Sequence, residues 1–275
     1  MLDTIRSILR DAQNAPDIFK RTLVKEYIQI LSLSFLYTHK QYSNLVFYGG
    51  SSLRHCYELP RLSEDLDFVD IEKNINITSL YEDICGFFRK KFNISVSGRC
   101  QKFRCILKFP VLYDLNIAGT EESDLLFIKI EVYKDFGFCS KYTNRVLPVF
   151  KFGQSLLIKT FDLPTLMATK IDAVLHRKWE RTSKNGKTLA KVKGRDYFDL
   201  LWYLRKGIQP NIACIRGVTD THDMYEQLIK LVQKVDVHSI KYDLQGLIQD
   251  QAYIETLTDN LKEILKNLLE ENKPR

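Results

Sequence analysis

The sequence predicts an α/β domain with a mixed sheet, followed by a C-terminal helical bundle domain. Up to about residue 155, short apolar runs with the two-residue period of strands are separated by helical segments. Beyond that point helical periodicity dominates to the end of the chain. A chain of 275 residues is long enough for two modest domains. We therefore expect domains at residues 1–155 and 156–275.

Each element has a local reason. Apolar residues at helical spacing predict helices over residues 2–12 and 17–39, and the apolar run at 45–48 predicts a buried strand that enters a Gly-Gly turn. A short helix should then start at Ser51 or Ser52, because serine is a favoured N-cap residue. The other expected strands cover residues 65–70, 93–98, 104–109 and 125–133, and the other expected helices cover residues 77–92, 164–178, 196–205, 222–235 and 251–269.

Composition bounds the protein class. No stretch approaches the roughly 18 consecutive apolar residues of a membrane span, and the N-terminus lacks a signal-peptide core, so we expect a cytoplasmic protein with no membrane partner. The six cysteines show no C-x-x-C pair and no zinc spacing. We expect them to be reduced and mostly buried thiols.

Positive charge is concentrated in one segment. Residues 176–195 hold eight Lys or Arg residues and one acid, Glu180, and their excess equals the net charge of +7 of the whole chain. Such a segment is commonly a solvated loop, but its sign suits a polyphosphate or a nucleic-acid backbone. We expect Lys187, Lys191 and Lys193 to contact RNA.

Two aspartates lie one residue apart on an expected strand. Because side chains alternate along a strand, Asp65 and Asp67 share one face while Leu66 and Phe68 face the core. Two carboxylates on one face suit a shared Mg²⁺ or Mn²⁺, or a pair of such ions, as used in phosphoryl and nucleotidyl transfer. An exposed acidic strand end is the alternative.

The turn before these aspartates favours a nucleotide. Gly49 and Gly50 allow close approach of a ligand to the backbone, Ser51 and Ser52 supply hydroxyls, and a helix N-terminus follows that can bind a phosphate. The chain has neither a Walker loop nor the G-x-G-x-x-G motif of dinucleotide enzymes. A phosphate-binding turn that leads into a metal-binding strand predicts a nucleotidyltransferase with an NTP substrate.

A third carboxylate is available on another strand. In the stretch 125–133, Glu131 lies on the face opposite the aliphatic side chains, so it reaches the metal if that face lines the active site. A solvent-exposed polar face is the alternative.

On a later helix, Lys170 and Arg177 lie two turns apart on one face and can bind the triphosphate, although Lys170 can also simply extend past apolar neighbours to solvent.

Three motifs in this order resemble the AbiEii/AbiGii toxin family of nucleotidyltransferases, over residues 25–204. They are the G-G-[ST]-x-L-R and P-R-x-S-E-D-L-D-F segments, then "KIDAVLHR", then "GRDYFDL". The chain has Tyr48 where family members often have lysine, and Leu62 where phenylalanine is usual. The matching residues of the first motif are Gly49, Gly50, Ser51, Leu53, Arg54, Pro60, Arg61, Ser63, Glu64, Asp65, Leu66, Asp67 and Phe68.

The resemblance implies a polymerase-β-like nucleotidyltransferase core, with the helical domain completing the active-site cleft. It implies that Asp196 is a catalytic carboxylate, either as a base or by fixing Lys170, whereas by position alone Asp196 could be an ordinary helix cap. It also implies transfer of a nucleotide to RNA, specifically the 3′ end of tRNA, by the toxin of a toxin-antitoxin pair with a cognate antitoxin.

Three alternatives remain open on the sequence. A small-molecule nucleotidyltransferase of the antibiotic-resistance type would use the same residues on another hydroxyl. A D-x-D glycosyltransferase would normally need a longer nucleotide-binding region before Asp65 than this chain has. A non-catalytic RNA-binding module would not need the intact acidic pair.

Overall fold

The computed structural model describes residues 1–119, 121–137, 139–183, 185–186 and 188–273. By its internal contacts the chain divides into two compact units, one made of residues 1–136 and 144–161 and the other of residues 137–143 and 162–275. None of the helices in the described part is both long and apolar enough to cross a membrane.

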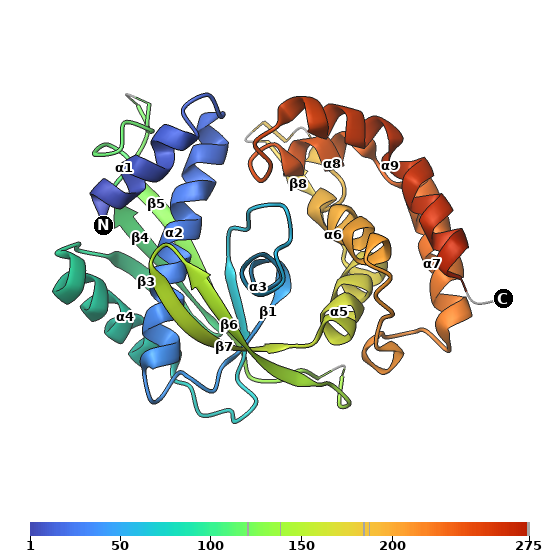
Figure 1. Cartoon of the computed structure of the whole chain (residues 1–275), viewed down its shortest axis with the longest axis horizontal. Helices are drawn as coiled ribbons and strands as arrows, with labels where there is room; N and C mark the ends of the chain where they lie inside the picture. Colours follow the sequence, from blue (N-terminus) through green and yellow to red (C-terminus); the bar gives the residue numbers. More distant parts are fainter. Residues whose placement is uncertain (120, 138, 184, 187, 274–275) are drawn as a thin grey trace. The chain divides into compact units, whose positions relative to one another are not determined.

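The first unit is built on a seven-stranded mixed sheet with the strand order β3-β4-β5-β2-β1-β7-β6. Helix α4 packs on β3 and β4, α2 packs on β5 and β7, and α1 packs on α2 (Figure 1). Its helices are α1 (Leu2–Asp11), α2 (Asp17–Thr38), α3 (Gly49–Cys56) and α4 (Ile77–Phe92). Its strands are β1 (Val46–Tyr48), β2 (Leu66–Val69), β3 (Ser97–Gln101), β4 (Arg104–Pro110), β5 (Leu125–Tyr133), β6 (Asn144–Lys151) and β7 (Gln154–Phe161).

The second unit is mainly helical. Helix α5 begins where Asp162 accepts a hydrogen bond from the backbone N–H of Thr165 at 3.0 Å, and α6 packs against both α5 and α8. Gly194 is required at the crossing of α6 and α8, because a β-carbon there would lie 2.4 Å from Ile240 Cα. The elements are α5 (Leu163–His176), β8 (Arg181–Thr182), β9 (Thr188–Ala190), α6 (Gly194–Arg205), a 3₁₀ turn (Ile212–Cys214), α7 (Thr221–Lys234), α8 (Val237–Leu244) and α9 (Gln251–Asn272).

The core of the first unit lies between the sheet and helices α2 and α4. Alternate residues of the central strands are fully buried, among them Phe68, Leu107 and Ile130. Their neighbours in sequence, such as Asp67 and Glu131, occupy the other face of the sheet. The alternation that buries the apolar residues therefore also presents the acidic ones.

Several local expectations were wrong. The short helix starts at Gly49, two residues before the predicted serine cap, and Ser51 makes no cap hydrogen bond. The β6–β7 hairpin, the β8–β9 pair and α8 were not predicted from the sequence. Cys139 and Cys214 form a disulfide within the second unit, so the expectation of six reduced cysteines was wrong for this pair. They lie 75 residues apart in sequence, which no motif spacing could indicate. The other four cysteines are free.

Candidate active site

The Gly-Gly turn lies directly against Asp67. Gly49 has a φ of +76°, and a β-carbon on it would lie 2.7 Å from Asp67 Oδ2. The turn follows β1, whose last residue Tyr48 pairs with Asp67 on β2. Only glycine combines this backbone conformation with so close an approach. The predicted phosphate-binding turn and the predicted acidic strand are therefore neighbours.

The two serine hydroxyls after the turn are used inside the protein. Both side chains are fully buried. Ser51 Oγ donates to the backbone carbonyl of Asp65. Thr160 Oγ1 donates to the carbonyl of Phe47 at 2.7 Å and lies 2.7 Å from Ser52 Oγ, so Ser52 donates to Thr160. The hydroxyls thus fix the turn to β2 and β7, and any contact of this turn with a ligand falls to its backbone.

The carboxylates form a row across two neighbouring strands. Strands β2 and β5 run parallel, and Asp67 is paired directly with Glu131. Asp65 immediately precedes β2 and follows the same face. Asp65 and Glu131 are both half-buried. The structure therefore brings all three predicted metal ligands to one face of the sheet.

Basic and phenolic groups lie among these carboxylates. Lys129 Nζ lies 3.1 Å from Asp65 Oδ2, and Arg104 Nη1 lies 3.3 Å from Glu131 Oε1. Tyr133 donates to Glu131 Oε2 at 2.6 Å, and its burial together with the carboxylates of Glu131 and Asp67 raises the pKa of Tyr133 well above its usual value. Lys129 and Tyr133 were not predicted as site residues, although both share the two-residue period of Glu131.

The donor set of this row suits a hard cation. Mg²⁺ and Mn²⁺ prefer oxygen ligands, and the row offers three carboxylates without a histidine or thiol. In the described part of the chain, no group of three acidic, histidine or cysteine residues is already gathered as a metal site. The three carboxylates are the type of ligand that such an ion needs. In this structure Asp65 is paired with Lys129, and Glu131 is paired with Arg104.

The second unit contains a buried charge cluster built from α5 and α6. Lys170 Nζ lies 2.7 Å from Asp196 Oδ1 and 2.8 Å from Asp199 Oδ2, and Arg177 Nη1 lies 2.6 Å from Asp196 Oδ2. Asp196 and Asp199 are buried. Asp196 thus holds both cations that the sequence assigned to the triphosphate. Asp199 shares Lys170, a contact that sequence analysis did not identify.

The charge state of Asp196 follows from its surroundings. Burial raises its pKa, but Lys170, Arg177 and Lys193 together outweigh burial and bring the pKa of Asp196 down to about 2. A carboxylate with so low a pKa is a weak proton acceptor near neutral pH, because an effective general base has a pKa close to the working pH. Between the two roles open for Asp196, the geometry and the charge favour fixing Lys170 and Arg177.

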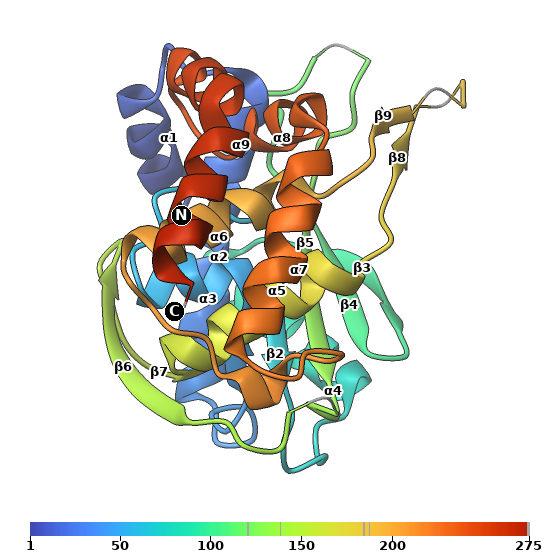
Figure 2. The same cartoon turned by 90° about the vertical axis from the view of Figure 1, so that its right-hand side faces the viewer.

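The predicted RNA-binding lysines differ in their surroundings. Lys191 is exposed, whereas Lys193 is half-buried, and burial lowers the pKa of Lys193 while the carboxylate of Asp196 opposes that effect. Lys187 lies outside the described residues. Strands β8 and β9 form a hairpin that extends away from α5 and α7 in Figure 2.

Comparison with known families shows which family the chain belongs to. The model of the nucleotidyl transferase AbiEii toxin family, type IV toxin-antitoxin system, matches residues 34–274. The chain belongs to this family. It is therefore a nucleotidyltransferase toxin of a type IV toxin-antitoxin system. The resemblance of the motifs around Gly49, Asp67 and Asp196 predicted such a toxin but not the type of the system.

Solved structures give a weaker likeness. One is JHP933 from Helicobacter pylori, 16% identical with a TM-score of 0.48, where the alignment covers 91% of this chain and 94% of that one. Another is a putative nucleotidyltransferase from H. pylori, 15% identical with a TM-score of 0.47, covering 92% and 98%. No curated protein matches the chain.

Two arginines of the AbiEii motif have structural partners. Arg54 Nε donates to Glu26 Oε1 at 2.5 Å, and Lys151 contacts the same buried carboxylate at 2.9 Å. Arg61 is 1% exposed and donates to the carbonyl of Leu62 at 2.8 Å. A β-carbon on Gly50 would lie 2.8 Å from Arg61 Nη2, so this arginine also requires the second glycine. Arg61 therefore lies directly against the turn, whereas Arg54 is held by Glu26 of α2.

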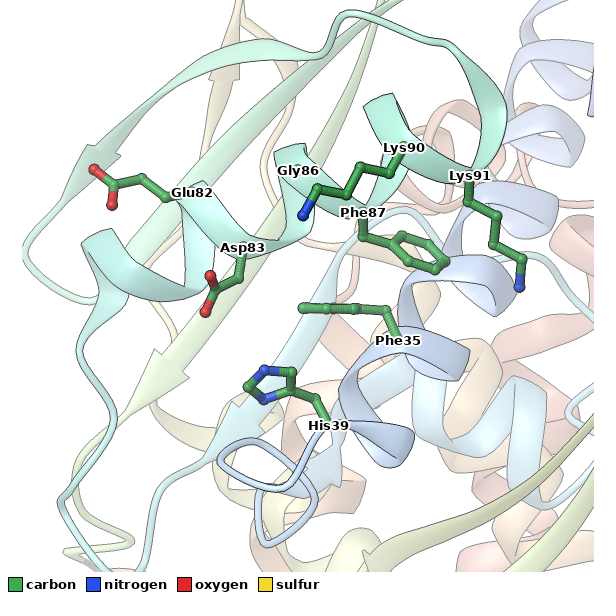
Figure 3. Close-up of a pocket in the computed structure, with 8 residues that line it drawn as sticks. All are labelled: Phe35, His39, Glu82, Asp83, Gly86, Phe87, Lys90 and Lys91. Carbon is green, nitrogen blue, oxygen red and sulfur yellow. The ribbon is translucent and has the colours of Figure 1, made fainter.

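One pocket lies apart from these residues. It has a volume of about 660 Å³ and opens between the end of α2 and α4, where the rings of Phe35 and Phe87 lie side by side (Figure 3). Lys90 and Lys91 extend from α4 beside these rings, with Asp83 nearby (Figure 3). None of the predicted AbiEii site residues lines it.

Proposed function

We propose that the protein transfers a nucleoside monophosphate from an NTP to an acceptor hydroxyl at the 3′ end of an RNA, in particular a tRNA. The close approach of Gly49 to the carboxylate of Asp67 carries this proposal, because it brings the turn that would bind phosphate beside a carboxylate that would bind the metal. Membership of the AbiEii family supports the reaction class.

Asp65, Asp67 and Glu131 would hold Mg²⁺ or Mn²⁺. When bound, the metal would neutralise charge on the phosphates and on the leaving pyrophosphate. The ammonium of Lys129 and the guanidinium of Arg104 would leave their carboxylates when the cation binds, because a divalent cation competes for the same oxygens.

The backbone N–H groups of Gly49 and Gly50, at the start of α3, would receive the NTP phosphates. Ser51 and Ser52 would hold this turn through their buried hydroxyls. Lys170 and Arg177 would bind the same triphosphate, with Asp196 as the residue that positions them. In this proposal the domains at 1–155 and 156–275 contribute the two sets of residues.

Residues 176–195 would carry part of the RNA contact through Lys187, Lys191 and Lys193, and a cognate antitoxin would counteract the toxin in a cytoplasm. Charge supports the RNA contact, since eight of these residues are basic. Charge reversal at Lys187 and Lys191 should weaken RNA modification more than NTP binding.

One experiment tests the reaction and its acceptor together. The protein is incubated with each α-labelled NTP in turn, with total RNA, and with Mg²⁺ or excess EDTA. We expect one nucleotide to enter tRNA-sized bands only when the metal is present. Transfer that is insensitive to added RNA would instead support the small-molecule alternative, and the absence of transfer from every NTP would contradict the proposal.

A further inference from the structure

The face of the sheet that carries the acidic row continues as a basic face over three strands. Directly paired residues point the same way, so Arg99 of β3, Arg104 and Lys108 of β4, and Phe127 and Lys129 of β5 share this face with Glu131. We call Arg99, Arg104, Lys108, Phe127 and Lys129 the basic sheet face. It holds four cations within three strands.

The opposite face of the same strands is the core. Cys105, Leu107, Ile128 and Ile130 are fully buried there, where α2 and α4 pack on the strands. Positions on the basic sheet face are half-buried or exposed in every case. This end of the sheet therefore has one face for folding and one that is accessible.

Two of the cations are available to a ligand. Lys129 and Arg104 have carboxylate partners in the acidic row. Within the described residues, Arg99 and Lys108 have none, and the one contact of the Lys108 ammonium is with the ring of Phe127, 5.7 Å from its centroid. A pair of cations without acids on an accessible face attracts a polyanion.

An aromatic ring is exposed among these cations. Phe127 is 45% exposed, whereas its neighbours in sequence, Leu126 and Ile128, point to the other face of the strand and are buried. A pocket of about 360 Å³ opens beside it, where Arg21 and Lys25 are paired with Glu122 and Glu64, so among the described residues the unpaired cations near the ring are those of the basic sheet face. Accessible aromatic rings on a sheet, among basic side chains, are a common way to stack single-stranded bases while cations track the backbone.

The basic sheet face leads into the carboxylates. Phe127, Lys129 and Glu131 are alternate residues of β5, so Phe127 lies about 13 Å along the strand from Glu131. Glu131 pairs with Asp67 on the next strand. A strand of nucleic acid lying on Phe127 and Lys108 would therefore direct one end at the acidic row.

We propose that the basic sheet face binds the single-stranded end of the acceptor RNA, with a base stacked on Phe127 and phosphates at Arg99 and Lys108. The inference rests on the proposed function and names the surface that delivers its acceptor. It adds a site to the one expected at residues 176–195. Charge on the face favours RNA over a protein partner, and the exposed ring favours unpaired bases over a duplex.

The first unit offers a matched control. Lys91 lies over the ring of Phe87, 5.4 Å from its centroid, so the pocket of Figure 3 repeats the pairing of lysine with phenylalanine. Glu82 and Asp83 line that pocket, and it opens beside α4, away from the acidic row. Phe150, 76% exposed on β6, is a second control, because it is another exposed phenylalanine of the same sheet.

The test measures RNA binding without catalysis. A fluorescent single-stranded 12-mer RNA is titrated with the full chain by anisotropy, in EDTA and without NTP, at several salt concentrations. Phe127→Ala should weaken binding about tenfold. The double variant Arg99→Gln/Lys108→Gln should weaken binding and lower the slope of log affinity against log salt by about 1.4, because each single-strand phosphate contact contributes about 0.7. Phe150→Ala and the double variant Lys90→Gln/Lys91→Gln should bind as wild type does.

A second titration with polyglutamate separates stacking from charge. Phe127→Ala should leave polyglutamate binding unchanged, and an equal loss for both ligands would contradict stacking. If both site variants bind RNA with the wild-type affinity, the inference is wrong. If the same samples still show metal-dependent transfer, the proposed function stands. If the wild-type protein transfers no nucleotide but its RNA binding is weakened by Phe127→Ala, the proposed function is wrong and the RNA-binding surface stands.

Discussion

Gly49 lies so close to Asp67 that a β-carbon on residue 49 would be 2.7 Å from Asp67 Oδ2. We predict that Gly49→Ala abolishes nucleotide transfer, because the methyl group displaces either the turn or the carboxylate. The φ of +76° adds about 1–2 kcal/mol of backbone strain, so the unfolding midpoint should also fall. Chemical denaturation and a transfer assay measure the two effects.

Gly86→Ala is the control for this change. Gly86 lies inside α4, and a β-carbon there has no neighbour within 4 Å. Alanine should stabilise the helix by about 0.5–1 kcal/mol and leave transfer unchanged. Wild-type transfer by Gly49→Ala would show that the contact with Asp67 has no part in the site.

Asp196 should act as a positioning residue. Asp196→Asn should raise the KM for NTP more than tenfold, because Lys170 and Arg177 lose the charge that holds them. With a pKa of about 2, Asp196 is ionised throughout the neutral range, so the wild-type kcat/KM profile should show no ionisation of this group between pH 5 and 8. An acidic limb in that range, with activity rising as the pH rises, that disappears in Asp196→Asn would identify Asp196 as the base instead.

The same depressed pKa predicts acid sensitivity. The folded pKa of Asp196 lies below its unfolded value of 3.8, so its contribution to stability is present above about pH 4 and is lost as the pH falls toward 2. Asp196→Asn should remove this part of the acid transition, which denaturation at pH 2–5 measures. An unchanged transition in the variant would contradict the low pKa.

His55 should make the first unit sensitive to milder acid. Burial lowers its pKa from 6.5 to about 3, so the unfolded chain binds this proton first. Stability is then full above pH 6.5 and declines below it, by about 2 kcal/mol between pH 7.5 and 5. His55→Gln should remove that decline, while His222→Gln on the exposed side of α7 should retain it. If the stability of His55→Gln depends on pH as that of the wild type does, His55 is not the cause of the decline.

Lys129 should compete with the metal for Asp65, which its ammonium contacts at 3.1 Å. Lys129→Gln should therefore lower the Mn²⁺ concentration for half-maximal binding about fivefold, in line with a partly exposed ion pair of about 1 kcal/mol. Calorimetric titration with Mn²⁺ checks this. Lys134→Gln, which removes a lysine beside Asp70 outside the row, should have the wild-type affinity. Weaker metal binding by Lys129→Gln would contradict competition.

Local patterns predicted the parts of the site that depend on neighbours in sequence. The two-residue period placed Asp65 and Asp67 on one face and gave the bounds of the strand that carries Glu131. Local patterns do not predict contacts between distant residues. Lys129 reaches Asp65 across 64 residues, a contact that depends on how the strands are paired. The contact of Asp196 with Lys170, across 26 residues, was expected only as one of two roles implied by the family resemblance.

The missed hairpin has a specific cause. Strands β6 and β7 turn at Phe152 and Gly153, whose φ angles of +48° and +72° are those of a tight hairpin turn. Such turns normally carry Asn-Gly, so Phe-Gly gave no signal, and Pro148 made the first run resemble a non-strand. The structure places β6 at the edge of the sheet, where proline is tolerated.

The most direct test of the central claim is the transfer of labelled NMP by Asp67→Ala, with Asp135→Ala as the control for loss of an exposed acid near the same strands. We predict that Asp67→Ala folds with the wild-type circular dichroism spectrum and transfers no label, whereas Asp135→Ala transfers normally. Full transfer by a folded Asp67→Ala would contradict the account.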